Sequence, residues 1–521
     1  MSAITPDSFV KLVRFDVNKE NQITFPDGVA QVNYFLNAEG IEASDFTYVR
    51  QEGKIRFPYV IDSIEKYNYV IVQNTPYNYK YYFYYITDMK YVNDEMTDVF
   101  IKLDVFQTYQ FDFIYKQSFV EREHVNDDTI GKHTVPEGLE MGEYVVNSYD
   151  RYEGFNNYCA FITATKPYDI ASEEIACSSV YVNGVPFSSF IYIAFSPTDI
   201  RHLLEFFTEN PIAGAESITS IYFIPRNLIT EDSYYTTVYK GYNVYIYEGE
   251  IAPFIFNHNE SKPTALNGYV PKNKKLLTYP YCFMVASNNS GTSNIYQYEK
   301  WKSANCQFDI SCVATCGCSI KLVPREYTEN HGYDEEEGIM CGKFPISNWV
   351  TQEYQTWLSQ NALNLNGQVA TGVLATAYGF SGLGDITTGI TGILQITDVM
   401  RQVYQHNMLP NSSHGNVNGG DLNFAQENLT FFFYKKSIRA EMAKIIDDYF
   451  SMFGYKVNAL KIPNISGRRN WNYVKTISVN VEGNDIPEKY QEEYKQMLNK
   501  GITFWHNPAT FLDYSQNNPI I

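Results

Sequence analysis

The sequence predicts a mainly β, multidomain protein of the α+β class, with its helices gathered late in the chain. The 521 residues suffice for three or four domains of about 150 residues each. Tyr, Phe and Trp make up 16% of the chain, and Tyr and Phe favour pleated, half-buried surfaces. Apolar and polar residues alternate in several stretches before residue 350, which is the pattern of strands with one buried face.

The first 125 residues predict an N-terminal β domain. Val99, Ile101, Leu103 and Val105 share one face of a strand, and Lys102 lies on the other. Residues 79–85 (YKYYFYY) form an aromatic run that is too short for a core helix, and the strand pattern continues over residues 111–115. Residues 126–149 are polar and punctuated by Gly and Pro, which predicts a connecting loop.

Residues 150–275 predict a middle α+β domain. Ser196 offers a helix N-cap, Pro197 the first helical position and Asp199 an acidic first turn, so a helix is expected from there to about Thr208. Strands are expected over residues 221–224 and 242–247.

Residues 276–350 predict a second β domain with one dominant signal. Apolar side chains occupy every second position, as expected for one long strand or for two strands joined by a turn. These positions are Cys306, Phe308, Ile310, Cys312, Ala314, Cys316, Cys318, Ile320 and Leu322.

Residues 421–521 predict a C-terminal α+β part with two helices and an intervening strand at Ile477, Val479 and Val481. In the first helix the apolar face holds Ile438, Met442, Ile445, Ile446, Tyr449, Phe450 and Phe453, the opposite face holds Arg439, Lys444, Asp447 and Asp448, and Gly454 ends it. The second helix spans residues 487–500, with Tyr490, Tyr494, Met497 and Leu498 on one face and Gly501 as its end.

Charge and composition exclude several classes of function. The 59 acidic and 40 basic residues give a net charge of −19, which disfavours tight nucleic-acid binding, because that requires Lys and Arg to neutralise phosphates. The N-terminus has no apolar core of the kind found in signal peptides. The sequence also lacks a run of eighteen or more apolar residues, so no conventional membrane span is expected. Eight Cys are too few for a disulfide scaffold, so folding in a reducing cytoplasm is expected.

No constellation in the sequence predicts catalysis or a cofactor. The Cys306, Cys312, Cys316, Cys318 and Cys341 group lacks the paired spacing of a zinc site and is better explained as a buried strand face.

Two charged stretches are better explained as solvent-exposed structure than as functional sites. Residues 121–124 (EREH), with Asp127 and Asp128 nearby, are expected to form a solvated strand end. Residues 334–337 (DEEE) are expected to form a solvated turn rather than a calcium loop. Two facing carboxylates of a glycosidase cannot be recognised in a single sequence, so that alternative stays open.

Residues 355–397 do not fit a soluble domain. Between Glu353 and Asp398 the only charged residue is Asp385. The segment is too Gly-rich for a core helix and too apolar for an exposed linker. Its glycines are Gly367, Gly372, Gly379, Gly382, Gly384, Gly389 and Gly392, and its large apolar residues are Val369, Val373, Leu374, Tyr378, Phe380, Leu383, Ile386, Ile390, Ile393, Leu394 and Ile396.

Three explanations remain open for this segment. It could be an irregular part of a core, a contact between copies of the chain, or a membrane segment that stays hidden until triggered. Together with the residues around it, it makes up a region over residues 351–420 that we describe as a helix followed by a Gly-rich apolar loop.

Several long patches carry a family resemblance. They are residues 99–125 (VFIKLDVFQTYQFDFIYKQSFVEREHV), 137–139 (EGL), 279–282 (YPYC), 434–436 (YKK), Glu441, Phe450, 453–456 (FGYK), 472–474 (NYV) and 501–506 (GITFWH). In these patches the chain resembles the distal tail, or tail knob, proteins of small short-tailed podoviruses of the Picovirinae type. These phages have protein-primed DNA replication and infect Gram-positive bacteria. The resemblance covers roughly the first 145 and the last 95 residues, together with the position of the apolar loop.

The resemblance implies a structural virion protein at the distal tip of the tail, assembled in the host cytoplasm. Six copies would form a hollow tube of tail-tube-like β-barrel domains, attached to the proximal tail (lower collar) protein. The apolar loops would plug the exit and then insert into the host cytoplasmic membrane as a pore. Viral DNA would pass through the lumen without specific binding. No catalytic residue, metal or cofactor is implied. The alternatives are a receptor- or cell-wall-binding module and a wall-degrading glycosidase.

Overall fold

The structure, a computed structural model, describes about seven tenths of the chain, which forms two compact units. The described residues are 8–16, 18–44, 47–49, 53–74, 79–154, 158–164, 180–182, 185–186, 190–209, 218–251, 253–288, 292–313, 319–328, 338–343, 346–348 and 430–521. Unit 1 comprises Met1–Gly142, Gly268–Leu276 and Ala440–Ile521, and unit 2 comprises Glu143–Asn267 and Leu277–Arg439. The finer division into six segments remains a prediction.

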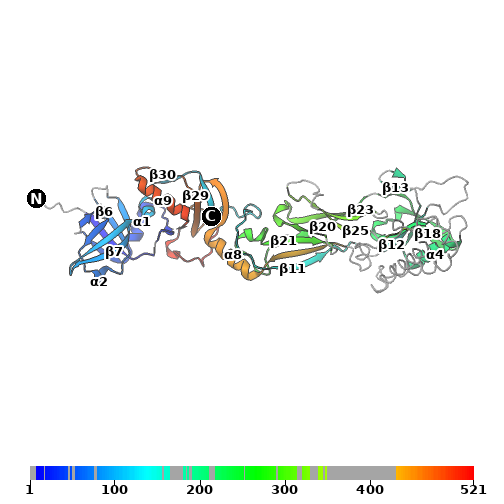
Figure 1. The fold of residues 1–521 in the computed structure, drawn as a ribbon, viewed down its shortest axis with the longest axis horizontal. Coiled ribbons are helices and arrows are strands. Elements are labelled where there is room, and N and C mark those ends of the chain that lie inside the picture. Colours follow the sequence, from blue (N-terminus) through cyan, green and yellow to red (C-terminus); the bar gives the residue numbers. More distant parts are fainter. Residues whose placement is uncertain are drawn as a thin grey trace, which may run out of the picture. The chain divides into compact units, whose positions relative to one another are not determined.

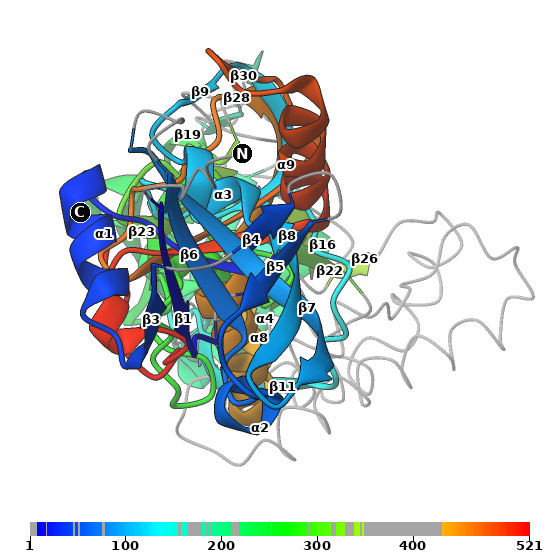
Figure 2. The same ribbon diagram turned by 90° about the vertical axis from the view of Figure 1, so that its left-hand side faces the viewer.

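Unit 1 begins with an antiparallel seven-stranded sheet in the order β3-β1-β6-β7-β8-β5-β4 (Figure 2). Its strands are β1 (Ser8–Val13), β3 (Gly40–Ala43), β4 (Thr47–Val49), β5 (Lys54–Phe57), β6 (Tyr69–Asn74), β7 (Tyr81–Asn93) and β8 (Met96–Leu103). Most of the aromatic run, from Tyr81 to Tyr85, lies in β7, as predicted, and the stretch from Val99 to Leu103 lies in β8. Val105 instead starts helix α3 (Val105–Tyr109), because Asp104 caps that helix by accepting a hydrogen bond from the backbone N–H of Gln107.

Two further helices belong to this part of unit 1. They are α1 (Gly28–Leu36) and α2 (Ile61–Ile64). Phe35 of α1 is fully buried against Val13, Tyr69 and Phe83 of the sheet. This aromatic packing is where much of the Tyr and Phe content of the N-terminal region is used.

A second sheet in unit 1 unites the two ends of the chain in the order β2-β31-β29-β10-β28. Its strands are β2 (Asn21–Ile23), β10 (Ser118–Glu123), β28 (Tyr455–Lys461), β29 (Trp471–Ser478) and β31 (Ile502–Trp505). A two-stranded sheet pairs β9 (Phe113–Tyr115) with β30 (Val481–Gly483). The pairs β10–β28 and β10–β29 bring residues near 120 beside residues near 460 and 476, so N- and C-terminal segments fold as one body.

Two predicted helices complete unit 1, α8 (Ala440–Phe453) and α9 (Glu488–Lys500) (Figure 1). Both end at the predicted glycines, Gly454 and Gly501, which have φ of 65° and 105°. Tyr494 of α9 stacks on Phe113 with ring centroids 4.1 Å apart, inside a core cluster that also contains residues of the seven-stranded sheet.

Three details of the C-terminal prediction are wrong. Ile445 was assigned to the buried face of α8 but is 61% exposed, whereas Asp447 was assigned to the solvent face and is completely buried. The intervening strand is also not continuous, because β29 ends at Ser478 and β30 begins at Val481.

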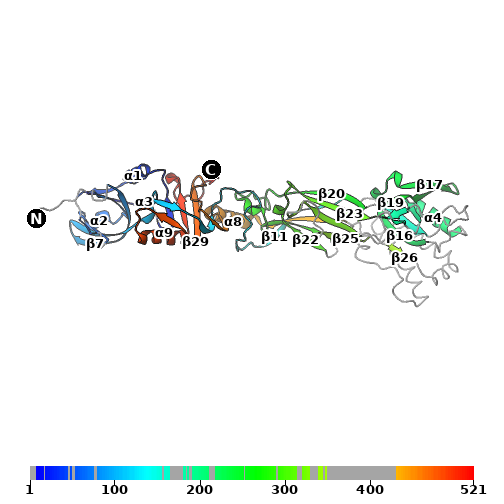
Figure 3. The same cartoon turned by 90° about the horizontal axis from the view of Figure 1, so that it is seen from above.

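The described residues of unit 2 form four more sheets (Figure 3). Their orders are β17-β18-β15-β12-β16-β26, β20-β23-β24-β25, β11-β27-β21-β22 and β14-β13-β19. The strands are β11 (Tyr144–Arg151), β12 (Tyr158–Ala164), β13 (Val180–Val182), β14 (Val185–Pro186), β15 (Phe190–Ala194), β16 (Ile218–Pro225), β17 (Tyr234–Tyr239), β18 (Tyr242–Tyr247), β19 (Gly249–Ile251), β20 (Pro253–Ser261), β21 (Cys282–Ser287), β22 (Ser293–Tyr296), β23 (Asn305–Val313), β24 (Ser319–Arg325), β25 (Ile339–Lys343), β26 (Ile346–Asn348) and β27 (Phe432–Ile438).

The sequence patterns of unit 2 are largely confirmed. Helix α4 (Pro197–Glu209) starts after Ser196, whose Oγ accepts from the Asp199 N–H at 3.2 Å, while the Asp199 carboxylate accepts from the Ser196 N–H at 2.9 Å. The long alternating stretch is two antiparallel strands, β23 and β24, rather than one. β11 starts inside the range predicted as a connecting loop.

Candidate functional site

The apolar segment over residues 355–397, with all of its predicted site residues, lies outside the described residues. Its neighbours in the chain are described. β26 precedes it as an edge strand paired with β16, and β27 follows it between β11 and β21. The assignment of individual residues to a membrane-active loop therefore remains a prediction. Within the part of the chain that is described, no helix is long and apolar enough to cross a membrane.

The strand end at residues 121–124 was predicted to be solvated, and this prediction is wrong. Arg122, Glu123 and His124 are all buried. A bulge in β10 between Val120 and Arg122 breaks the simple alternation, so neighbouring side chains no longer divide between a wet and a dry face. The buried Glu123 carboxylate accepts from Lys461 Nζ and, at 2.8 Å, from the Asn464 N–H.

Glu137 is the centre of a buried ion-pair network. Its carboxylate pairs with both Arg122 and Lys275, and it also accepts from the backbone N–H of Lys456 at 2.9 Å. Burial lowers the pKa of Lys275, and the negative charge of Glu137 opposes that shift. Glu137 comes from a segment without helix or strand, so the network fixes that segment to the sheet that contains β10 and β28.

His124 has no free ring nitrogen for acid–base catalysis. Nδ1 accepts from the Tyr473 N–H at 2.7 Å, which places the ring proton on Nε2, where it is donated to the Ser451 carbonyl at 3.1 Å. Burial and the nearby charge of Arg468 lower the pKa of His124 to about 3. The ring is therefore neutral at physiological pH, and its hydrogen bonds join β29 to α8.

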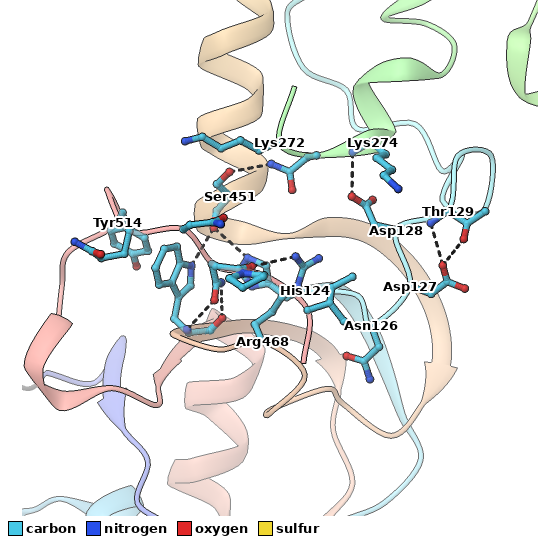
Figure 4. A pocket seen from close by; sticks show the side chains of 17 residues that line it. His124, Asn126, Asp127, Asp128, Thr129, Lys272, Lys274, Ser451, Arg468 and Tyr514 are labelled. Carbon is cyan, nitrogen blue, oxygen red and sulfur yellow. Dashed lines mark hydrogen bonds between the residues drawn. The ribbon is translucent and has the colours of Figure 1, made fainter. Parts of the chain in front are cut away.

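An open pocket of about 420 Å³ lies beside His124 (Figure 4). It is lined by His124, Asn126, Asp127, Asp128, Thr129, Lys272, Asn273, Lys274, Ser451, Arg468, Trp471, Tyr514 and the segment from Gln516 to Ile520. In the described residues, no three His, Cys, Asp or Glu side chains are grouped as metal ligands would be. Sequence reasoning noted Asp127 and Asp128 but missed the pocket, because Arg468 and residues 516–520 reach it only through the fold.

The structure describes only part of the cysteine group and none of the acidic stretch that the sequence analysis considered. Cys306 and Cys312 are buried on β23, and burial raises the pKa of Cys306 to about 12, so it is a thiol in the core. Cys316, Cys318 and the acidic stretch 334–337 lie outside the described residues, and the side chain of Cys341 is not described.

These features define a class of protein. Residues 5–116, which include the N-terminal sheet, match a family model, the N-terminus of caudoviral major tail proteins. This match indicates the class of structural proteins of phage virion tails. A second model, the C-terminal domain of tail knob protein gp9 of Bacillus phage phi29, matches residues 247–519, more than half of the chain. The chain therefore belongs to the phi29 gp9 tail knob family.

Proteins that align with almost the whole chain are also named tail knob proteins. The chain is 22% identical to tail knob protein gp9 of Bacillus phage B103 over 605 aligned positions, covering 98% of this chain and all of that protein. It is 23% identical to gp9 of phage phi29, covering 95% of each. The solved structure of the bacteriophage C1 tail knob protein, gp12, matches with a TM-score of 0.67 at 14% identity, over 99% of this chain and 100% of that one. That likeness shows a shared fold.

Proposed function

We propose that six copies of this chain form a hollow tube at the distal tip of the tail. The apolar segment over residues 355–397 closes the tube until it inserts into the host cytoplasmic membrane and opens a pore for the genome. Its partners are other copies of the chain, the proximal tail (lower collar) protein, the host membrane and the passing DNA. The observation that carries the proposal is the apolar segment, whose one charge between Glu353 and Asp398 is Asp385.

The physical chemistry of a conduit supports the assembly. The seven-stranded sheet ends in the short strands β3 and β4, and closure between copies removes such open edges. The net charge of −19 suits a channel wall. Tight binding of DNA requires basic side chains that displace the counterions of its phosphates, and an acidic wall does not displace them. Six apolar segments in one lumen shield one another from water, and a bilayer shields them again after release. In the bilayer the segments have to become helical or pair, since the backbone finds no water there.

Dye leakage from liposomes tests the membrane step. We expect the full chain to release dye and a variant lacking residues 367–397 to release none. A length-preserving variant with Leu383, Ile386, Ile390 and Ile393 changed to Ser separates loss of apolarity from loss of chain. Leakage that survives both changes would exclude the segment as the membrane-active part.

Imaging with mass measurement tests the assembly. A six-fold ring of about six times the 60.0 kDa chain supports the tube. A chain that stays monomeric both alone and when seated on tails would contradict it. Binding to purified cell walls without leakage would instead favour the receptor- or wall-binding module, and clearing of peptidoglycan would favour a glycosidase.

A further inference from the structure

Arg468 is a buried cation that forms no ion pair with the described residues around it. Only 8% of the residue is exposed, and its Nε is buried without a hydrogen-bond partner. Nη1 donates to the Asn518 carbonyl at 3.2 Å, and within the described residues the guanidinium makes no ion pair. Buried charges are ordinarily paired, so an unmatched guanidinium lining a pocket indicates a ligand of opposite charge.

The two carboxylates of the pocket are already engaged elsewhere. Asp128 accepts from the Tyr455 hydroxyl at 2.6 Å with one oxygen and from the Lys274 N–H at 3.0 Å with the other. Asp127 pairs with Lys132 and accepts from the Thr129 N–H at 2.9 Å, and Figure 4 shows Asp127 and Thr129 at the end of the pocket away from Tyr514. Asp128 acts on Arg468 through space without binding it.

Two further donors line the same pocket as the guanidinium. The backbone of Lys274 is fixed by Asp128, and its exposed ammonium group has no hydrogen bond or ion pair among the described residues. Asn126 uses its Oδ1 to accept from Asn464, which leaves its Nδ2 as a further donor. His124 does not compete, because it is neutral and its ring N–H is donated to Ser451.

We propose that this pocket binds the oxyanion of a small molecule, a phosphate or a carboxylate, between Arg468 and Lys274. A guanidinium fork matches both groups, since two N–H donors can meet two oxygens of one anion. A volume of about 420 Å³ holds more than a bare ion, and Trp471 and Tyr514 give the wall apolar surface for the remainder of the ligand. All residues that line the pocket belong to unit 1.

Calorimetric titration of the full chain tests the site, with inorganic phosphate and acetate as probes at constant ionic strength. We expect saturable binding with one site per chain. Lys274→Ala and Arg468→Lys should each weaken binding about 10-fold, the effect of one charge-assisted hydrogen bond. Arg468→Lys keeps the charge and removes the Nε donor. Lys66→Ala, which removes an exposed cation that pairs with Glu39 at 3.8 Å and lies over the ring of Tyr67, is the matched control and should bind as wild type.

The two probes identify the source of the anion. Tighter binding of phosphate assigns a phosphorylated ligand, and tighter binding of acetate assigns a carboxylate. If Arg468→Lys does not fold, Lys274→Ala decides, because that side chain is exposed and its loss leaves the core intact. No saturable binding of either probe, or equal binding by Lys274→Ala and wild type, overturns the proposal.

Discussion

Lys275 and Glu137 form an ion pair almost without contact with water, with side chains 3% and 1% exposed. Each side chain has a second partner. Glu137 also forms an ion pair with Arg122, and Lys275 Nζ donates a hydrogen bond to the Val135 carbonyl at 2.8 Å. Removal of the shared Glu137 carboxylate leaves two buried cations without an anion, a far larger cost than loss of a surface pair.

The first prediction follows from this pair. Glu137→Gln should lower the free energy of unfolding by about 3–5 kcal/mol, measured by urea denaturation. Glu140→Gln removes an exposed carboxylate from the same segment and should change stability by less than about 0.5 kcal/mol. Equal effects of the two changes would show that the network does not stabilise the fold.

Asp447 and Asp448 make a second matched pair. Asp447 accepts from the N–H groups of Lys272 and Asn273 at 2.7 and 3.0 Å and from the Tyr269 hydroxyl at 2.8 Å, whereas Asp448 is exposed. Asp447→Asn places an amide among these donors and should cost about 2–4 kcal/mol of stability. Asp448→Asn should be close to neutral, and protease cleavage near residues 268–276 should rise only in Asp447→Asn. Wild-type behaviour of both variants would contradict the anchoring role.

Gly454 is required for close approach as well as for its φ of 65°. A Cβ there would lie 2.1 Å from the Glu123 carbonyl oxygen, whereas a Cβ at Gly138, with φ 70°, meets nothing within 4 Å. Gly138→Ala should therefore cost only the left-handed strain of about 1 kcal/mol, and Gly454→Ala considerably more. Thermal unfolding of the two variants measures the difference, and similar shifts would refute the steric argument.

His124 predicts how stability depends on pH. Its pKa is about 3 in the folded chain and about 6.5 when unfolded, so the unfolded chain binds the proton more tightly. Its stabilising contribution is complete above about pH 6.5 and declines as the pH falls towards 3. Between pH 7 and 5 the free energy of unfolding should drop by about 2 kcal/mol from this residue. Burial lowers the pKa of His506 to about 4, which acts in the same direction.

Denaturation at pH 7 and pH 5 measures this dependence. His124→Gln is the control, since it removes the titrating group, and it should show a shallower pH slope than wild type even if it is less stable overall. Parallel slopes would exclude His124 as a source of the pH dependence.

Asp385 predicts a pH effect on the proposed membrane step. A charged Asp at the bilayer centre costs about 2.5–3.5 kcal/mol on insertion scales. Mildly acidic buffer or Asp385→Asn should therefore increase liposome leakage, and the variant should lose the pH dependence. Leakage that is independent of both pH and residue 385 would count against insertion of this part of the segment.

The sequence determined the local structure and the class of protein. Period-2 patterns located strands such as β8 and β23, caps and glycines located α4, α8 and α9, and specific patches indicated the family. These signals are local, because the neighbours that decide them lie within a few residues. The tertiary structure decided which polar residues are buried. Asp447 lies on the polar side of its helix by spacing alone, but the segment around Asn273 covers it.

The same holds for the candidate pocket and the buried network. Arg468, Lys274 and His124 are separated by long stretches of chain, and a bulge in β10 reversed the expected exposure of the strand end. The burial of a charge depends on partners supplied by distant segments, whose positions no local pattern records. Only the fold therefore brings these charged groups together as a buried ion-pair network and a pocket.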